Sequence, residues 1–184
     1  MNGCLDAALT YVARGWAVLP IRAGGKKPLI AGGYKVASTN AETVRDWFDQ
    51  WPDMNIAIQP GASGLIVADI DTAEAEAAAI ELGLFREPTR RIATGRRWLP
   101  AHHPKHFARS SHFYFRPPTL PCAVGKRTVR GIEFIGRSGY VLVPPSIHTP
   151  TGARYELECD AEPLALPLEA WQVLAAAPPS ERPD

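Results

Sequence analysis

Two aspartates separated by one residue end an apolar stretch of the chain. Residues 65–71 read LIVADID, so four apolar residues lead directly to Asp69 and Asp71. Because side chains alternate across a strand, both carboxylates are expected on one face, with Cα atoms about 6 to 7 Å apart. Such a pair can bind one hard divalent cation or two close ones. Asp71 or Thr72 could instead cap a following helix, so the motif alone leaves both interpretations open.

A further acid and a histidine lie in other apolar segments. Glu133 is the single charged residue of GIEFIG, and His112 shares a strand face with Tyr114 and Arg116 in SHFYFR. A lone acid in a strand is usually solvent-facing, and a lone histidine is usually structural. Taken together with the aspartate pair, these residues suit phosphoryl transfer from a nucleoside triphosphate. Carboxylates would hold Mg²⁺ or Mn²⁺, while histidine, arginine and lysine donors would hold phosphates.

The surrounding sequence predicts helices and strands mixed around a mostly antiparallel sheet, an α+β fold. A capping box is expected at Thr39, with Glu42 three residues later. Strands 55–60 and 64–71 are expected to be neighbours, and strands 129–136 and 140–146 are expected to form a hairpin. The helices are predicted near 4–14, 40–51, 73–83 and 168–177, and the other strands near 16–22, 90–94, 111–116 and 153–157.

Composition indicates a globular protein with an uneven charge distribution. The 184 residues are 46 % hydrophobic and 21 % charged, with net charge +1. Between residues 86 and 137, 12 Lys and Arg stand against 2 acids, which suits a polyphosphate partner, although a solvated charged face is the alternative. Three widely spaced cysteines argue against a disulfide framework. No membrane span or secretory signal is apparent, so a cytoplasmic location is expected.

The order of these motifs resembles a known family. An aspartate pair after a strand, SxH at Ser110–His112, and YVLVPPSIHTPTGARYE after an acid-bearing strand and a glycine turn follow one another. This order resembles the bifunctional primase-polymerase domain of the archaeo-eukaryotic primase superfamily, found in phage and plasmid replication proteins. The resemblance covers nearly the whole chain. It implies a primase-type core with an RRM-like antiparallel sheet and an N-terminal α/β module over residues 1–176, followed by a Pro-rich linker at 177–184.

The resemblance also implies roles for individual residues. Asp69, Asp71 and Glu133 match the metal-binding acids of a two-metal Mg²⁺ or Mn²⁺ site, although the family usually has Asp at the third position. Ser110 and His112 match the motif whose histidine contacts the phosphates of the incoming nucleotide. The further expected triphosphate or primer contacts are Arg116, Arg137, Ser146 and His148.

A basic insertion separates Gly95 from His112. Its residues 96–111 contain Arg96, Arg97, Lys105 and Arg109 with Trp98 and Phe107, a composition that suits contact with a template or primer strand. His102, His103 and His106 raise the alternative of zinc, which the absence of a nearby cysteine other than Cys122 disfavours.

The sequence therefore predicts a metal-dependent, template-directed nucleotidyltransferase that extends or synthesises primers. Expected partners are single-stranded DNA template and primer, dNTPs or NTPs, and a helicase domain fused to the same polypeptide. One alternative is an HUH-type replication-initiator endonuclease, but no two histidines here are separated by one bulky apolar residue. The other is a catalytically inactive nucleic-acid-binding module, which the glutamate at 133 would favour.

Overall fold

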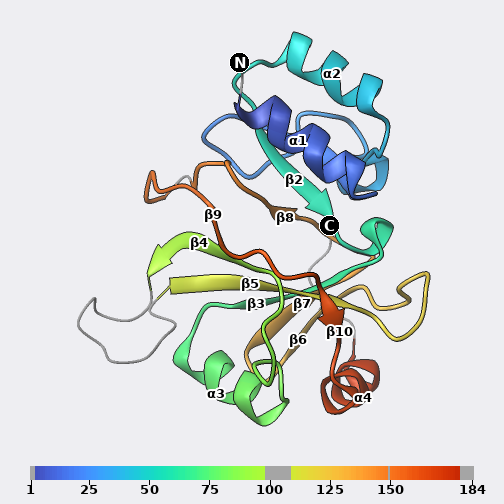
Figure 1. Cartoon of the computed structure of the whole chain (residues 1–184), viewed down its shortest axis with the longest axis vertical. Helices are drawn as coiled ribbons and strands as arrows, with labels where there is room; N and C mark the ends of the chain where they lie inside the picture. Colours follow the sequence, from blue (N-terminus) through green and yellow to red (C-terminus); the bar gives the residue numbers. More distant parts are fainter. Residues whose placement is uncertain (1–2, 98–108, 149, 179–184) are drawn as a thin grey trace.

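Two β-sheets of unequal size form the centre of the molecule, with helices outside each of them (Figure 1). The computed structural model describes residues 3–97, 109–148 and 150–178, apart from the side chains of Arg96, Arg97 and Arg109. The helices in these ranges are α1 (Gly3–Ala13), α2 (Ala41–Gln50), α3 (Ala73–Glu81) and α4 (Leu168–Ala176), with the short 3₁₀ helices η1 (Gly33–Val36) and η2 (Gly61–Ser63).

The smaller sheet contains β1 (Ala17–Ile21), β2 (Asn55–Gln59) and β8 (Val141–Leu142), paired antiparallel in the order β1-β2-β8. Helices α1 and α2 lie above it in Figure 1. Every position of β1 and β2 is buried, including the polar residues Asn55 and Gln59 at the two ends of β2. We call residues 3–59 together with β8 the N-terminal module.

The larger sheet carries six strands in the order β6-β7-β3-β5-β4-β9, and β10 pairs parallel with β5. The other pairings are antiparallel. Its strands are β3 (Ile66–Ile70), β4 (Arg91–Arg97), β5 (Arg109–Arg116), β6 (Lys126–Val129), β7 (Ile132–Ile135), β9 (Glu156–Cys159) and β10 (Leu164–Ala165). This mixture of helices and mostly antiparallel strands confirms the predicted α+β class.

The two faces of the larger sheet belong to different hydrophobic cores. Ala68, Phe113 and Phe134 pack in the core beneath α3 and α4. Val67 and Tyr114, their sequence neighbours, pack in the core shared with the N-terminal module. Since side chains alternate along a strand, the odd-numbered residues of β3 face that module.

Helices α2 and α3 each begin at a polar N-cap residue. The cap of α2 is Asn40, whose side chain accepts hydrogen bonds from the backbone N–H of Glu42 and of Thr43. The prediction of Thr39 was therefore wrong by one position, because Asn40 is the extended residue directly before the first helical turn. Thr72 caps α3 and accepts from the Ala75 N–H at 3.1 Å, so the capping role falls to Thr72 rather than to Asp71.

Two predicted strand pairings were wrong. Strands β2 and β3 are consecutive in sequence, yet they lie in different sheets, and so do β7 and β8. The hairpin formed is instead β6–β7, closed at Arg130 and Gly131, which both have positive φ. Short apolar runs fit either sheet, so their sequences did not distinguish these partners.

Two of the connections between the sheets, from β2 to β3 and from β7 to β8, touch each other. The Gly61 N–H donates to the Gly136 carbonyl at 3.0 Å. A Cβ atom on Gly61 would lie 2.6 Å from the Arg137 Cα, and one on Gly136 would lie 2.3 Å from the Val124 oxygen. Glycine is therefore required at both positions of this crossing, which we call the sheet crossing.

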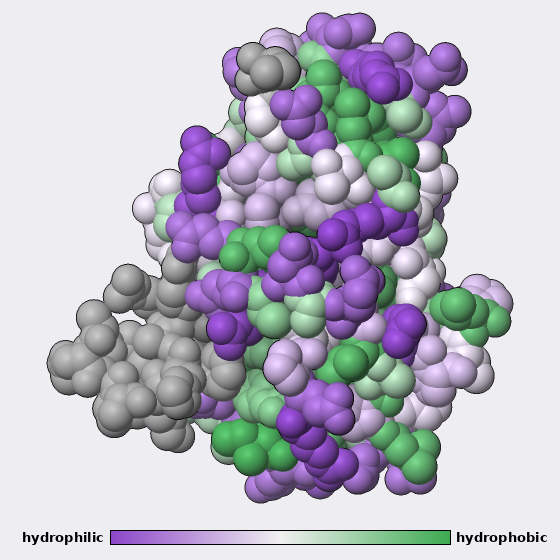
Figure 2. All heavy atoms as spheres, in the orientation of Figure 1, coloured by the Kyte–Doolittle hydropathy of each residue, from purple (hydrophilic) through white to green (hydrophobic). Residues whose placement is uncertain are grey.

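On the face shown in Figure 2, mostly hydrophilic residues cover the boundary between the N-terminal module and the larger sheet. Ion pairs bridge the halves: Arg14, just after α1, lies 3.2 Å from Glu162 and 3.8 Å from Asp160. Of the described helices, none is both long enough and apolar enough to cross a membrane.

Candidate functional site

Three of the predicted site residues form a row across the centre of the larger sheet. In the antiparallel registers, Asp69 on β3 is paired with His112 on β5 and with Glu133 on β7. Directly opposite residues of neighbouring strands place their side chains on the same face. The sheet therefore brings Glu133, Asp69 and His112 together, on the face toward the N-terminal module.

A cavity of about 280 Å³ lies over this row. Strand β8 and the turn before it contribute Tyr140 and Leu142 to its wall, and the loop after β1 contributes Lys26. The full lining is Lys26, Asp69, His112, Lys126, Glu133, Ile135, Gly139, Tyr140, Val141, Leu142 and Tyr155. We call this candidate active site the catalytic cavity.

Two lysines that the sequence interpretation missed face the acids. The Lys126 ammonium lies 2.9 Å from a Glu133 carboxylate oxygen. Lys26 acts on both Asp69 and His112 by charge, and its carbonyl accepts a 2.6 Å hydrogen bond from the Tyr140 hydroxyl. The GGKKP sequence around Lys26 indicated a basic turn, but its position over the sheet depends on tertiary structure.

Asp69 lies in an environment that disfavours its negative charge. Burial, followed by the nearby charges of Asp71 and Glu133, raises the pKa of Asp69 to about 7. Lys26 and a 3.5 Å hydrogen bond from the Ser110 hydroxyl oppose this shift without cancelling it. The carboxylates of Asp71 and Glu133 thus add negative potential at Asp69, which a bound cation would neutralise.

The side chains fit a hard divalent cation in chemistry, but they do not form a closed ligand set as they lie. Within the described ranges, no three Asp, Glu, His or Cys side chains are grouped closely enough to hold a metal ion. Glu133 is engaged by Lys126 instead. A metal ligated by Glu133 would therefore have to compete with this ion pair.

His112 is buried beside the acids. It is 6 % exposed, and its Nε2 lies 3.8 Å from an Asp69 carboxylate oxygen, too far for a hydrogen bond. Its Nδ1 has no hydrogen-bond partner among the described residues. Burial, with a smaller contribution from Lys26, lowers the pKa of His112 to about 3, so the ring is neutral at pH 7. It can offer a phosphate a neutral N–H donor.

The other predicted contacts lie outside the catalytic cavity. Arg116 is exposed at the far end of β5, and Arg137 lines a separate cavity beyond the turn after β7. The buried Ser146 hydroxyl exchanges two hydrogen bonds with the backbone of Ile56, at 2.8 and 2.9 Å, and so fastens its segment to β2. The His148 Nδ1 and the Thr151 hydroxyl are hydrogen-bonded at 2.9 Å. The Tyr155 ring, which lines the cavity, contacts the rings of both His112 and His148.

Part of the basic insertion is not among the described residues. Trp98, Lys105, Phe107 and the three histidines of 102–106 lie outside the described residues, as does the end of the predicted linker at 179–184. Their predicted roles stay predictions.

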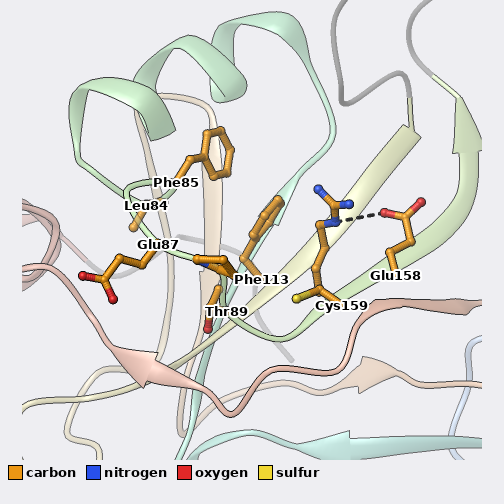
Figure 3. Close-up of a pocket in the computed structure, with 9 residues that line it drawn as sticks. Leu84, Phe85, Glu87, Thr89, Phe113, Glu158 and Cys159 are labelled. Atoms are coloured by element: carbon orange, nitrogen blue, oxygen red, sulfur yellow. Dashed lines mark ion pairs between the residues drawn. The ribbon is translucent and has the colours of Figure 1, made fainter.

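A second pocket opens at the edge of the opposite face of the sheet (Figure 3). Its volume is about 370 Å³, and it is lined by Leu84, Phe85, Glu87, Pro88, Thr89, Arg91, Phe113, Glu158 and Cys159. The Arg91 Nε and the Glu158 carboxylate form an ion pair of 3.0 Å at one wall. It includes none of the predicted site residues.

Comparisons with known proteins agree with the order of motifs along the chain. No match is found among curated proteins. The family model for the N-terminal domain of bifunctional DNA primase/polymerases, Prim-Pol, matches residues 8–183. With nearly its whole length matched, the chain belongs to the bifunctional DNA primase/polymerase family.

Proposed function

We propose that this protein is a metal-dependent nucleotidyltransferase that extends, and in favourable conditions starts, DNA primers on a single-stranded template. Family membership supports DNA primase/polymerase activity in general. The observation that carries the finer proposal is the row Glu133–Asp69–His112 at the base of a cavity lined by two lysines.

The acids would hold the cations. Asp69, Asp71 and Glu133 are the proposed ligands of Mg²⁺ or Mn²⁺, which would activate the primer 3′-hydroxyl and neutralise charge on the leaving pyrophosphate. The negative potential that Asp71 and Glu133 add at Asp69 supports this assignment.

The remaining lining groups would hold the triphosphate. Lys126 would leave its ion pair with Glu133 and bind a phosphate oxygen instead. Lys26, from the N-terminal module, would supply a second ammonium group. His112 donates its neutral N–H, and burial fixes the position of its ring. The cavity volume of about 280 Å³ is close to the lower end of the range for small-molecule sites.

The replication setting proposed is that of a phage or plasmid, with a helicase domain on the same polypeptide supplying single-stranded template. This extension rests on the resemblance of the sequence.

The decisive test is extension of a labelled primer on a DNA template with dNTPs or NTPs and with Mg²⁺ or Mn²⁺. Asp69→Asn with Asp71→Asn should lower the extension rate by at least about 100-fold, because the chief ligands are lost. Asp46→Asn with Asp49→Asn, an equal charge change on the exposed side of α2, is the matched control and should extend normally.

Normal extension by the double variant would refute the proposed site. Absence of extension by the wild-type protein, together with DNA binding in a gel shift, would identify a catalytically inactive module. A covalent protein–DNA adduct on a nicked origin would identify the HUH-type endonuclease instead.

A further inference from the structure

A third cavity lies beside the sheet crossing and outside the catalytic cavity. Its volume is about 640 Å³, larger than that of the catalytic cavity or the pocket in Figure 3. The N-terminal module and the loop between β5 and β6 both contribute to it. Its lining is Tyr34, Lys35, Ala37, Gln59, Gly61, Ala62, Pro121, Cys122, Ala123 and Arg137. We call it the crossing cavity.

The charge of the crossing cavity is of one sign. Its lining holds two basic residues, Lys35 and Arg137, both exposed, and no acid. The catalytic cavity has two lysines against two carboxylates, and the pocket in Figure 3 has one arginine against two glutamates. A cavity whose only charged lining residues are basic favours anions such as phosphates.

The floor of the cavity is rigid. Gln59 is only 4 % exposed; its amide Nε2 donates to the Gly136 carbonyl at 3.0 Å, and its amide oxygen accepts from the Ala62 N–H. The Gly61 N–H donates to the same carbonyl. Since this network is already made, the cavity needs no rearrangement to exist, which lowers the cost of binding.

An aromatic ring stands beside one of the two cations, Lys35. The Lys35 ammonium lies 5.8 Å from the centroid of the Tyr34 ring, and both residues belong to η1. A base can stack on an aromatic face while a neighbouring cation contacts its phosphate, and this combination is typical of proteins that bind single strands without reading sequence.

The turn between β7 and β8 contributes to both the crossing cavity and the catalytic cavity. Arg137 lines the first, and Gly139 and Tyr140, in the same turn between β7 and β8, line the second. A strand whose end is in the catalytic cavity would therefore reach the crossing cavity by passing over this turn.

From this arrangement we infer that the crossing cavity binds one nucleotide unit of single-stranded DNA, with its base on Tyr34 and its phosphate between Lys35 and Arg137. The inference rests on the proposed function, because the strand held is the one that the polymerase copies or extends. It assigns Arg137 to the DNA strand rather than to the triphosphate.

The test measures binding of a fluorescein-labelled oligo-dT 12-mer by fluorescence anisotropy between about 50 and 300 mM NaCl, in EDTA and without dNTP, so that no catalysis is involved. Lys35→Ala and Arg137→Ala should each weaken binding severalfold and lower the slope of log K against log salt by about 0.7, the value for one lost phosphate contact on a single strand. Tyr34→Leu should weaken binding about 5-fold or more, whereas Tyr34→Phe, which keeps the ring, should bind normally.

Arg130→Ala is the matched control, because it removes an exposed arginine at the opposite end of the β6 strand. Normal binding by this control, with losses in the cavity variants, supports the inference. Equal losses in the control, or wild-type binding by Lys35→Ala and Arg137→Ala at unchanged melting temperature, would overturn it.

Displacement of the oligonucleotide by dTTP is measured in parallel. If the cavity variants lost dTTP binding but kept oligonucleotide binding, the cavity would be a site for free nucleotides and the inference would be wrong. The outcome is separable from that of the proposed function: extension with unaltered strand binding in the variants refutes only this inference, and altered strand binding without extension refutes only the polymerase proposal.

Discussion

Asp69 occupies the middle of the row Glu133–Asp69–His112, in an environment that disfavours its negative charge. Its side chain is 26 % exposed, and the negative charges of Asp71 and Glu133 act on it. Residues selected for chemistry commonly lower the stability of a fold, because the same groups that bind a ligand repel one another without it.

The metal-free protein should therefore lose stability as pH rises from about 4 to about 7. In this window Asp69 is ionised in the unfolded chain, whose pKa is near 3.8, but still holds its proton in the folded state, whose pKa is about 7. The folded state binds more protons, so the free energy of unfolding falls as pH increases. Asp69→Asn removes this penalty, and its melting temperature in EDTA should exceed that of the wild type by about 2 °C or more at pH 8, with a smaller gain at pH 5.

Thermal unfolding followed by circular dichroism measures both values. Asp46→Asn serves as the control because it lies on the solvent side of α2. A gain for Asp69→Asn that is the same at pH 5 and pH 8 would show that titration of Asp69 is not its cause.

At the scale of elements, the sequence predicted what is encoded locally. The four helices and most strands lie close to their predicted ranges, because their apolar spacing, caps and terminating Gly or Pro residues are all contained in short segments. Asp69, His112 and Glu133 were likewise found from their positions on strands.

Local sequence patterns did not predict which strands pair when those strands are far apart in the sequence. The assignment of β2 and β3 to different sheets depends on the turn at η2 and on the sheet crossing, which no short segment specifies. For the same reason the sequence did not indicate that Lys26 and Lys126 face the acids, since one comes from a loop and the other from an edge strand.

Substitution at the sheet crossing should be costly. Gly61→Ala would place a methyl group 2.6 Å from the backbone of Arg137, and Gly136→Ala would place one 2.3 Å from the Val124 oxygen. Backbone must shift in both cases, so each variant should lose about 1 to 3 kcal/mol of unfolding free energy in urea titrations.

Gly3→Ala is the control for these variants. A Cβ atom there meets nothing within 4 Å, and alanine favours helix, so stability should stay the same or rise. If Gly61→Ala were as stable as the wild type, the close approach at the crossing would be wrong.

At the scale of the whole molecule, an aromatic stack joins the N-terminal module to the larger sheet. The Trp16 ring lies between Tyr11 and Tyr114, with centroid distances of 5.6 and 5.7 Å and nearly parallel planes. The buried Arg90 guanidinium lies 5.4 Å from the Trp16 ring and also pairs with Asp160. The stack thereby sets the position of the module that carries Lys26.

Trp16→Leu should therefore affect nucleotide binding as well as stability. We expect a loss of up to about 3 kcal/mol in unfolding free energy and a raised KM for dNTP, because Lys26 is less firmly held over the catalytic cavity. Trp16→Phe should keep most of both properties. Urea titration and steady-state extension kinetics measure them.

Trp171→Leu is the matched control, since Trp171 packs against the other core beneath the sheet. It should lower stability without raising KM. A Trp16→Leu variant with lowered stability and normal KM would show that the module is positioned by other contacts.

The pairing of β2 with β8 has a consequence for how the chain is made. Ile58 pairs with Val141, so the small sheet joins strands that are far apart in sequence. Strands β3 to β7 of the larger sheet lie between them, and β9 and β10 follow β8. During synthesis from the N-terminus, β2 leaves the ribosome with one edge exposed and waits for β8 until most of the chain has been translated. The N-terminal module and the larger sheet therefore complete their folding together. The row of Glu133, Asp69 and His112 gains the cavity wall formed by β8 only when this folding is complete.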